Sequence, residues 1–170
     1  YGMGGFRYNN MSPADLYKQN KVIQETSKIP ALIAANIEAG GDGGVGGGTH
    51  FGHHVTIGAT QDKENAYKLG YYGCKEAAAI GCNWTFAPIV DINKNWRNCV
   101  VSSRCFSSEA EQVLDMSKEY LRGAKDAGLA SCMKHFPGDG LDERDQHIVT
   151  TTICLLKNGK KTSVKFIEAW

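Results

Sequence analysis

The chain has 170 residues and a mass of 18.5 kDa, which is the length of one ordinary domain. Its 19 basic and 18 acidic residues nearly balance, which excludes a protein that binds nucleic acid through a basic surface. No apolar stretch approaches the roughly 18 residues of a membrane-spanning helix, and no signal peptide is visible. Six scattered cysteines without a CxxC pair favour free thiols in a reducing compartment. We therefore expect a cytoplasmic protein, and secretion stays open because the chain does not begin with Met.

Helices and strands are predicted to alternate along the chain. Ser12, followed by proline, is typical of a helix start. Thr60 or Asp62 begins the second helix, and Ser108 with Glu111 forms a capping box at the third. In chain order we predict helix 12–27, strand 30–36, helix 60–81, strand 83–91, helix 108–128 and strand 129–136.

This alternation predicts an α/β protein with a parallel sheet and right-handed crossovers. The predicted strands begin about 50 residues apart, whereas a minimal barrel unit has roughly 30 residues. The loops after the strands, 37–58, 92–107 and 137–150, are therefore long. In barrels and open α/β sheets alike, the chemistry is placed at this carboxyl edge, so we expect the functional residues there.

The first loop contains GGDGGVGGG, in which Gly41, Gly43 and Gly46 form a literal G-x-G-x-x-G. Such a segment binds dinucleotides when a helix begins on it, but we expect the next helix only near residue 60. A flexible loop at the substrate edge is favoured, and a nucleotide-binding α/β domain stays an alternative. Three histidines follow within 50–54 without carboxylate or cysteine ligands at suitable spacing, which favours a polar loop over a metal site.

The segment KHFPGDG, at 134–140, ends the last predicted strand and is followed by Asp145 and His147. Lys134 and His135 can donate hydrogen bonds to sugar hydroxyls or to a carboxylate. On extended backbone Asp145 and His147 share one side, where the aspartate holds the ring and raises its basicity. A protonated histidine is then available as a general acid near neutral pH. Taken alone, a D-x-H pair also fits an ordinary loop.

KHFPGDG with the D-x-H pair resembles the family 3 glycoside hydrolases, in particular their β-N-acetylglucosaminidase (β-hexosaminidase) branch. Three further segments resemble the same family in the same order, namely PALIAANIEAGG, GCNWTFAPIVDIN and SSRCFSSE. The similarity runs over about residues 1–152, which the resemblance assigns to part of the catalytic N-terminal domain. It implies a partial (β/α)8 TIM-type barrel, parallel strands with crossover helices, in a bacterial cytoplasmic enzyme.

The resemblance also implies roles for individual residues, carried over position by position. His147 would be the catalytic acid/base, and Asp145 would be its partner. Asn36 stands where the family commonly has Asp, and Asp91 has a structural role at least as readily as a binding one. No metal and no organic cofactor is implied. The substrate-binding residues would be Lys134, His135, Arg104, Asp91, Asn36 and Glu38.

A retaining glycosidase needs a carboxylate nucleophile about 5 Å from the acid/base, and the family supplies it from an aspartate well downstream. No aspartate follows His147 in this chain, so we expect the isolated chain to lack the nucleophile and to be inactive. An open partial barrel exposes sheet edges, which favours a homo-oligomer that completes it.

Residues 153–170 show no clean hydrophobic period and no helix signal. A coding frame shifted by two bases can encode a Ser-capped amphipathic helix, as the family would have there. We therefore hypothesise an out-of-frame tail, with a naturally divergent tail as the alternative.

The function predicted from these features is retaining hydrolysis of terminal β-linked N-acetylglucosamine in glycans or peptidoglycan fragments. A β-glucosidase or a glycoside phosphorylase of the same family is the alternative enzyme. A non-catalytic fragment and a nucleotide-binding domain are the alternatives from other classes.

Overall fold

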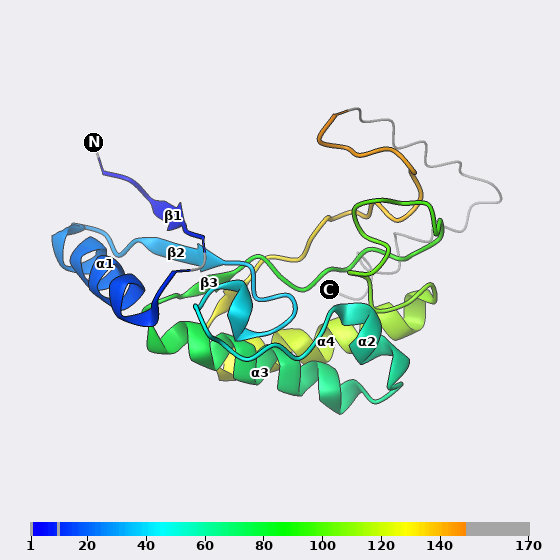
Figure 1. Ribbon diagram of the computed structural model, residues 1–170, viewed down its shortest axis with the longest axis horizontal. Coiled ribbons are helices and arrows are strands. Elements are labelled where there is room, and N and C mark those ends of the chain that lie inside the picture. Colours follow the sequence, from blue (N-terminus) through cyan, green and yellow to red (C-terminus); the bar gives the residue numbers. More distant parts are fainter. Residues whose placement is uncertain (1, 10, 149–170) are drawn as a thin grey trace.

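The computed structural model describes residues 2–9 and 11–148. Four parallel strands form one sheet in chain order, and the helices lie along it (Figure 1). The α/β class with a parallel sheet is therefore as predicted. The strands are β1 (Gly5–Arg7), β2 (Leu32–Ala35), β3 (Trp84–Thr85) and β4 (Ala130–Ser131). The helices are α1 (Pro13–Thr26), α2 (His54–Ala59), α3 (Lys63–Ala79) and α4 (Ala110–Asp126), with a 3-10 turn, η1 (Gly41–Gly43).

The regular strands are shorter than the sequence predicts. β3 ends at Thr85, although strand 83–91 was expected, because Pro88 has no N–H to continue the ladder. Parallel contact with the last strand segment resumes at Ile89, which pairs with Lys134. β1 precedes the predicted elements and was missed, since three residues carry too little pattern to predict a strand.

The helix ends follow the predicted caps in two cases out of three. The Ser12 hydroxyl accepts a hydrogen bond from the Asp15 amide, and the Asp62 carboxylate caps α3. The capping box predicted for the third helix is wrong. Glu109 is the N-cap of α4, because the Ser107 hydroxyl accepts the Glu109 N–H in a turn that delays the helix.

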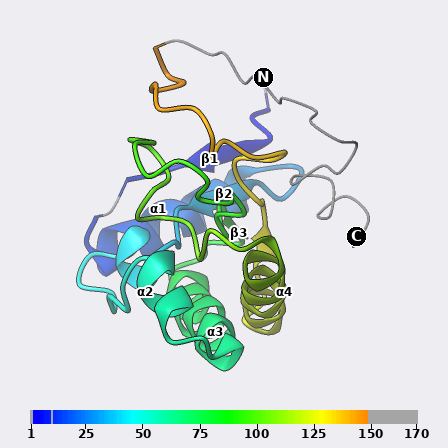
Figure 2. The same cartoon turned by 90° about the vertical axis from the view of Figure 1, so that its right-hand side faces the viewer.

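Helices α3 and α4 cross in close contact beneath the sheet (Figure 2). Glycine makes this approach feasible on both helices. A Cβ at Gly70 would lie 2.3 Å from the carbonyl oxygen of Tyr120, and one at Gly123 would lie 2.3 Å from that of Tyr67. The core between the helices and the sheet is apolar and includes Leu16, Ile33, Leu69, Val113 and Tyr120.

The glycine loop is packed and hydrogen bonded, so the expectation of a flexible loop is wrong. Gly40 adopts φ 144°, and a Cβ there would lie 2.1 Å from the Thr49 carbonyl oxygen. The ends of the loop are joined by a 2.7 Å hydrogen bond from Phe51 N to Ala39 O. Glu76 on α3 accepts from both the amide and the hydroxyl of Thr49. The glycines form only the short 3-10 turn η1, and no α-helix begins on them, although α2 starts earlier than the predicted residue 60.

Several predictions concern parts of the molecule that the structure leaves open. The boundary at 152 and the tail 153–170 lie outside the described residues, and both stay predictions. Among the described residues, none of the helices is both long and apolar enough to span a membrane.

The sheet carries an apolar hollow of about 300 Å³ lined by residues that include Phe6, Leu32, Trp84 and Phe86.

Candidate active site

Two long loops rise from the sheet on the side away from α3 and α4 (Figure 2). They are loops 92–107 and 137–148, and they follow β3 and β4. Because the strands are parallel, their carboxyl ends lie at one edge. Loop residues therefore meet the segment that follows β2, where Glu38 lies.

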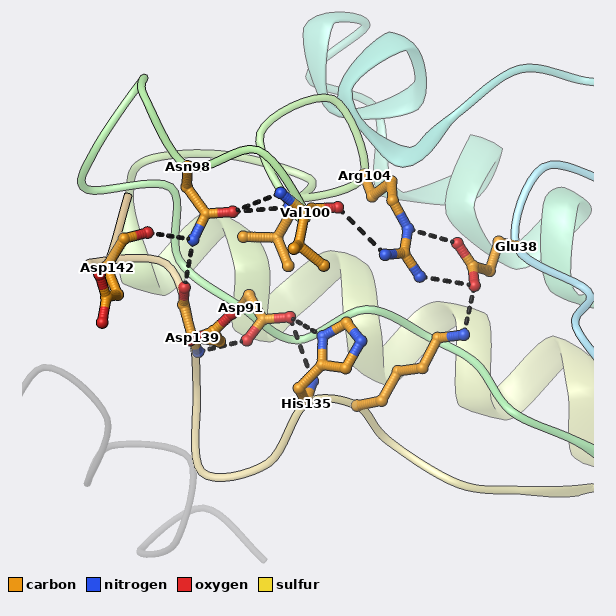
Figure 3. Close-up of polar contacts among 10 residues, drawn as sticks. Glu38, Asp91, Asn98, Val100, Arg104, His135, Asp139 and Asp142 are labelled. Atoms are coloured by element: carbon orange, nitrogen blue, oxygen red, sulfur yellow. Dashed lines mark hydrogen bonds and ion pairs between the residues drawn. The ribbon is translucent and has the colours of Figure 1, made fainter. Parts of the chain in front are cut away.

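Glu38, Arg104 and Lys134 form an ion cluster at this edge (Figure 3). The Arg104 guanidinium donates two 2.9 Å hydrogen bonds, from Nε to Oε2 and from Nη2 to Oε1 of Glu38. Lys134 Nζ donates to the same Oε1. Three segments that are far apart in the sequence are therefore joined by one carboxylate.

The ion cluster holds Glu38 ionised. Burial by itself raises the pKa of Glu38, whose side chain is 14% exposed, but the hydrogen bonds and positive charges of Arg104 and Lys134 outweigh burial. The pKa of Glu38 falls from 4.5 to about 2 as a result. The hydrogen bond with Glu38 is also the main cause that raises the pKa of Arg104, so the Glu38–Arg104 pair stays ionised near neutral pH.

Asp91 organises a second group of contacts beside the ion cluster, which we call the aspartate centre. Its buried carboxylate accepts a 2.6 Å bond from the Asp139 amide, a 3.1 Å bond from the His135 amide, and a 2.7 Å contact with His135 Nδ1. Figure 3 shows the His135 ring between Asp91 and the Arg104–Glu38 pair. Asp91 thus fixes the His135 ring so that its other nitrogen, Nε2, faces away from the aspartate.

Asn98 connects the two loops and was not predicted from the sequence. This side chain is 1% exposed. Its Nδ2 donates to the carbonyl oxygens of Asp139 at 2.6 Å and Asp142 at 2.7 Å. Its Oδ1 accepts from the amides of Val100 and Val101. One asparagine in a polar loop gives no pattern that could have identified this role.

The pair Asp145 and His147, which we call the dyad, forms as predicted but with a different backbone. His147 Nδ1 lies 2.6 Å from Asp145 Oδ1, and the same oxygen accepts the His147 amide at 2.9 Å. The pair therefore sits in a turn rather than on the extended backbone that was expected, because the carboxylate folds back onto the amide two residues later. The His147 side chain is 73% exposed, so its Nε2 is accessible.

The structure brings together five of the eight predicted site residues, and the other three are Asn36 and the two members of the dyad. Glu38, Arg104, Lys134, His135 and Asp91 lie in the connected clusters (Figure 3). Asn36 follows β2 directly, but its side chain forms none of the bonds that join these clusters. The dyad is exposed on the outer part of loop 137–148, and among the described residues no side-chain hydrogen bond joins it to the clusters.

In the histidine-rich segment His54 departs from the predicted polar loop, whereas His50 and His53 are exposed as such a loop would have them. His54 begins α2, is 1% exposed and stacks on Phe106 with ring centroids 4.1 Å apart. Neither of its ring nitrogens has a hydrogen-bond partner among the described residues. Burial lowers the pKa of His54 to about 3, although the nearby Glu38 acts in the opposite direction. His54 is thus a neutral core residue.

No group of three or more His, Cys, Asp or Glu side chains in the described part of the chain is arranged to hold a metal ion. The glycine loop gives no support to nucleotide binding either, since α2 begins eleven residues after η1 ends. This edge of the sheet carries fixed cationic N–H donors, and the loop that follows β4 carries an exposed imidazole paired with its own carboxylate. These groups are suited to hydroxyl recognition and acid/base chemistry.

Fold and site together define an α/β barrel segment with its polar chemistry at the carboxyl ends of the strands. The sequence pattern described as "Glycosyl hydrolase family 3 N terminal domain" matches residues 8–158. This chain belongs to glycosyl hydrolase family 3, and its four strands form part of the (β/α)8 barrel, as predicted.

Three relatives illustrate this membership. A Cellulomonas fimi protein named "Beta-N-acetylglucosaminidase/beta-glucosidase" is 38% identical over 149 residues, which are 88% of this chain and 26% of that protein. A solved structure described as "Beta-glucoside phosphorylase BglX" is 39% identical with a TM-score of 0.82 and covers 85% of this chain and 26% of its own. A family 3 β-N-acetylglucosaminidase from Paenibacillus sp. str. FPU-7 is 34% identical with a TM-score of 0.80, at 85% and 29% coverage. The chain spans less than a third of the length of each.

Proposed function

We propose that this chain carries the acid/base dyad and part of the sugar-binding site of a retaining glycosidase that removes terminal β-linked N-acetylglucosamine. The observation that carries the proposal is the 2.6 Å contact between His147 Nδ1 and Asp145 Oδ1, which leaves Nε2 accessible. The contact lies in a chain of this family, whose relatives include proteins named for N-acetylglucosaminide cleavage.

The chemistry of the dyad follows from its hydrogen bonds. The amide and the ring of His147 lower the pKa of Asp145, so the carboxylate is charged and holds the imidazole through Nδ1. Nε2 of His147 would protonate the leaving oxygen in the first step and would take a proton from water in the second. The nucleophilic carboxylate would come from outside these residues.

The ion cluster and the aspartate centre would bind the terminal sugar. Lys134, Arg104 and His135 would donate to its hydroxyls, because each keeps part of its side chain exposed. Glu38 and Asp91 would orient these donors, since their carboxylates already accept hydrogen bonds from them. Donors fixed in this way need no reorganisation when the sugar binds.

Sugar binding by the 170-residue chain tests the proposal directly. We expect saturable binding of N-acetylglucosamine in calorimetry and weaker binding of glucose. Lys134→Met should weaken the binding, whereas Lys118→Met, on the exposed face of α4, should leave it unchanged. A folded wild-type chain that binds neither sugar would overturn the proposal.

Turnover of an aryl β-N-acetylglucosaminide tests the role of the dyad and the expected absence of a nucleophile. We expect the chain alone to release no more aryl alcohol than His147→Ala does. Turnover that His147→Ala abolishes would support the acid/base role but would contradict the expected lack of a nucleophile. Turnover that survives in His147→Ala would refute the acid/base role.

A β-glucoside phosphorylase is the second candidate, because one of the most similar solved structures is described as such. A histidine acid/base can carry a positive charge, so it repels an incoming phosphate less than a carboxylate would. Inorganic phosphate then competes with the nucleophilic water. Phosphate binding that depends on His147, together with a preference for glucose, would favour this candidate over the hydrolase.

A further inference from the structure

Trp96 stands out among the residues of loop 92–107. Its side chain is 80% exposed, although tryptophan usually buries most of its large apolar surface. An indole left in water in this loop contributes little apolar burial to folding. Tryptophan is enriched at binding interfaces, because its ring offers a large apolar face together with a polar N–H.

The backbone on both sides of Trp96 is braced against loop 137–148. The amides of Lys94 and Asn95 donate to the Gly140 carbonyl oxygen at 3.1 and 3.0 Å. The Asn95 side chain donates to the Leu141 carbonyl oxygen at 2.9 Å, and Asn98 holds the same loop from the other side. The indole therefore stands on a fixed turn, and binding would cost little ordering entropy.

Arg97 connects the indole to the part of the loop that carries the dyad. Its guanidinium carbon lies 5.2 Å from the centroid of the Trp96 ring, and its Nη1 lies 3.7 Å from Glu143 Oε2. Glu143 precedes Asp145 by two residues, so their Cα atoms are at most about 7 Å apart. Both loops lie on the same side of the sheet (Figures 1 and 2).

We propose that Trp96 forms a binding subsite for the sugar on the leaving-group side of the scissile bond. The inference rests on the function proposed above, in which His147 meets the leaving oxygen and the ion cluster holds the terminal sugar. The second sugar must then extend past the dyad, toward the surface that Trp96 occupies. A pyranose ring presents a face of C–H groups, and the electron-rich face of an indole attracts such groups.

This subsite adds affinity for an oligosaccharide over a monosaccharide. Arg97 covers part of one indole face, and the exposure of the side chain leaves the rest of the ring for the sugar. The ligand is a β-linked N-acetylglucosaminyl disaccharide or a longer oligomer. The monosaccharide lacks the second ring that this subsite would bind.

The test compares N-acetylglucosamine with its β-1,4-linked dimer on the 170-residue chain, by calorimetry and by NMR of the tryptophan indole N–H groups. We expect the dimer to bind about fivefold more tightly than the monomer and to shift the Trp96 signal. Trp96→Ala should bind the dimer no better than the monomer, and Trp96→Phe should keep part of the difference. The monomer affinity should stay unchanged in both variants.

Ile29→Ala is the matched control, because Ile29 is 81% exposed in the connection that leads into β2, at the amino ends of the strands. It should bind both sugars like the wild type. If Trp96→Ala retains the full dimer preference while the wild type binds N-acetylglucosamine, the subsite is refuted and the proposed function stands. If the folded wild type binds neither sugar, both proposals fail. Circular dichroism checks that each variant folds.

Discussion

The charge of Glu38 is predicted to stabilise the protein substantially. In the substitution Glu38→Gln the side chain keeps its shape and loses its negative charge. Arg104 and Lys134 then face each other across a neutral amide. Removing one member of a largely buried ion cluster leaves the remaining charges without compensation.

The magnitude follows from the pKa of Glu38. Folding lowers it from 4.5 to about 2, and each pKa unit corresponds to about 1.4 kcal/mol. The shift of about 2.5 units therefore amounts to about 3 kcal/mol of stability. Because the folded pKa is depressed, this stability is fully present above pH 4.5 and is lost as the pH falls toward 2.

Urea unfolding of wild type and Glu38→Gln at a series of pH values measures the effect. We expect the variant to be less stable by about 3 kcal/mol at pH 7, with the difference shrinking as the pH falls from 4.5 toward 2. Glu64→Gln is the matched control, since Glu64 forms a half-exposed pair with Arg122 at 3.7 Å, and little change is expected there. Equal stability of wild type and Glu38→Gln at pH 7 would refute the reasoning.

Three further predictions concern the core, the helix crossing and the open sheet. Burial lowers the pKa of His54 from 6.5 to about 3, so stability present above pH 6.5 is lost as the pH falls. His54→Leu should reduce the loss between pH 7 and pH 5 by about 2 kcal/mol in urea unfolding, and an unchanged loss would contradict the burial argument. Gly123→Ala places a Cβ 2.3 Å from the Tyr67 carbonyl oxygen and should cost about 1–3 kcal/mol. Gly4→Ala, which meets nothing within 4 Å, is its control, and equal effects would rule out the clash. Light scattering should give a solution mass above 18.5 kDa if a homo-oligomer completes the sheet, and a strictly monomeric mass would exclude that oligomer.

Local sequence patterns predicted much of the fold because they reflect interactions between residues that are close in the sequence. Ser12 and Asp62 begin helices where expected, since their side-chain oxygens satisfy amides of the first turn. The predicted cap at Ser108 was wrong because Ser107, an equally good acceptor, formed a turn first. When two neighbouring residues can each form the same local hydrogen bond, tertiary packing determines which of them does.

The glycine loop and the histidines that follow it show where prediction from a short sequence segment fails. Glycine is compatible with flexibility and with close packing, and only the positions of Thr49 and Glu76 show that this loop is packed. His54 belongs to a polar segment in the sequence, yet it is buried against Phe106. Both outcomes depend on partners that lie far away along the chain.

For the site, the sequence by itself determined the residue types and the edge on which they lie. The family resemblance supplied the roles, and the family match supports the barrel. Only the tertiary structure decided that the Glu38 carboxylate binds Arg104 and Lys134, and that Asn98 joins two loops. The physical reason is that parallel strands place their ends side by side, whereas the loops that follow are long enough to meet in many ways. Which side chains meet is therefore set by packing rather than by spacing in the sequence.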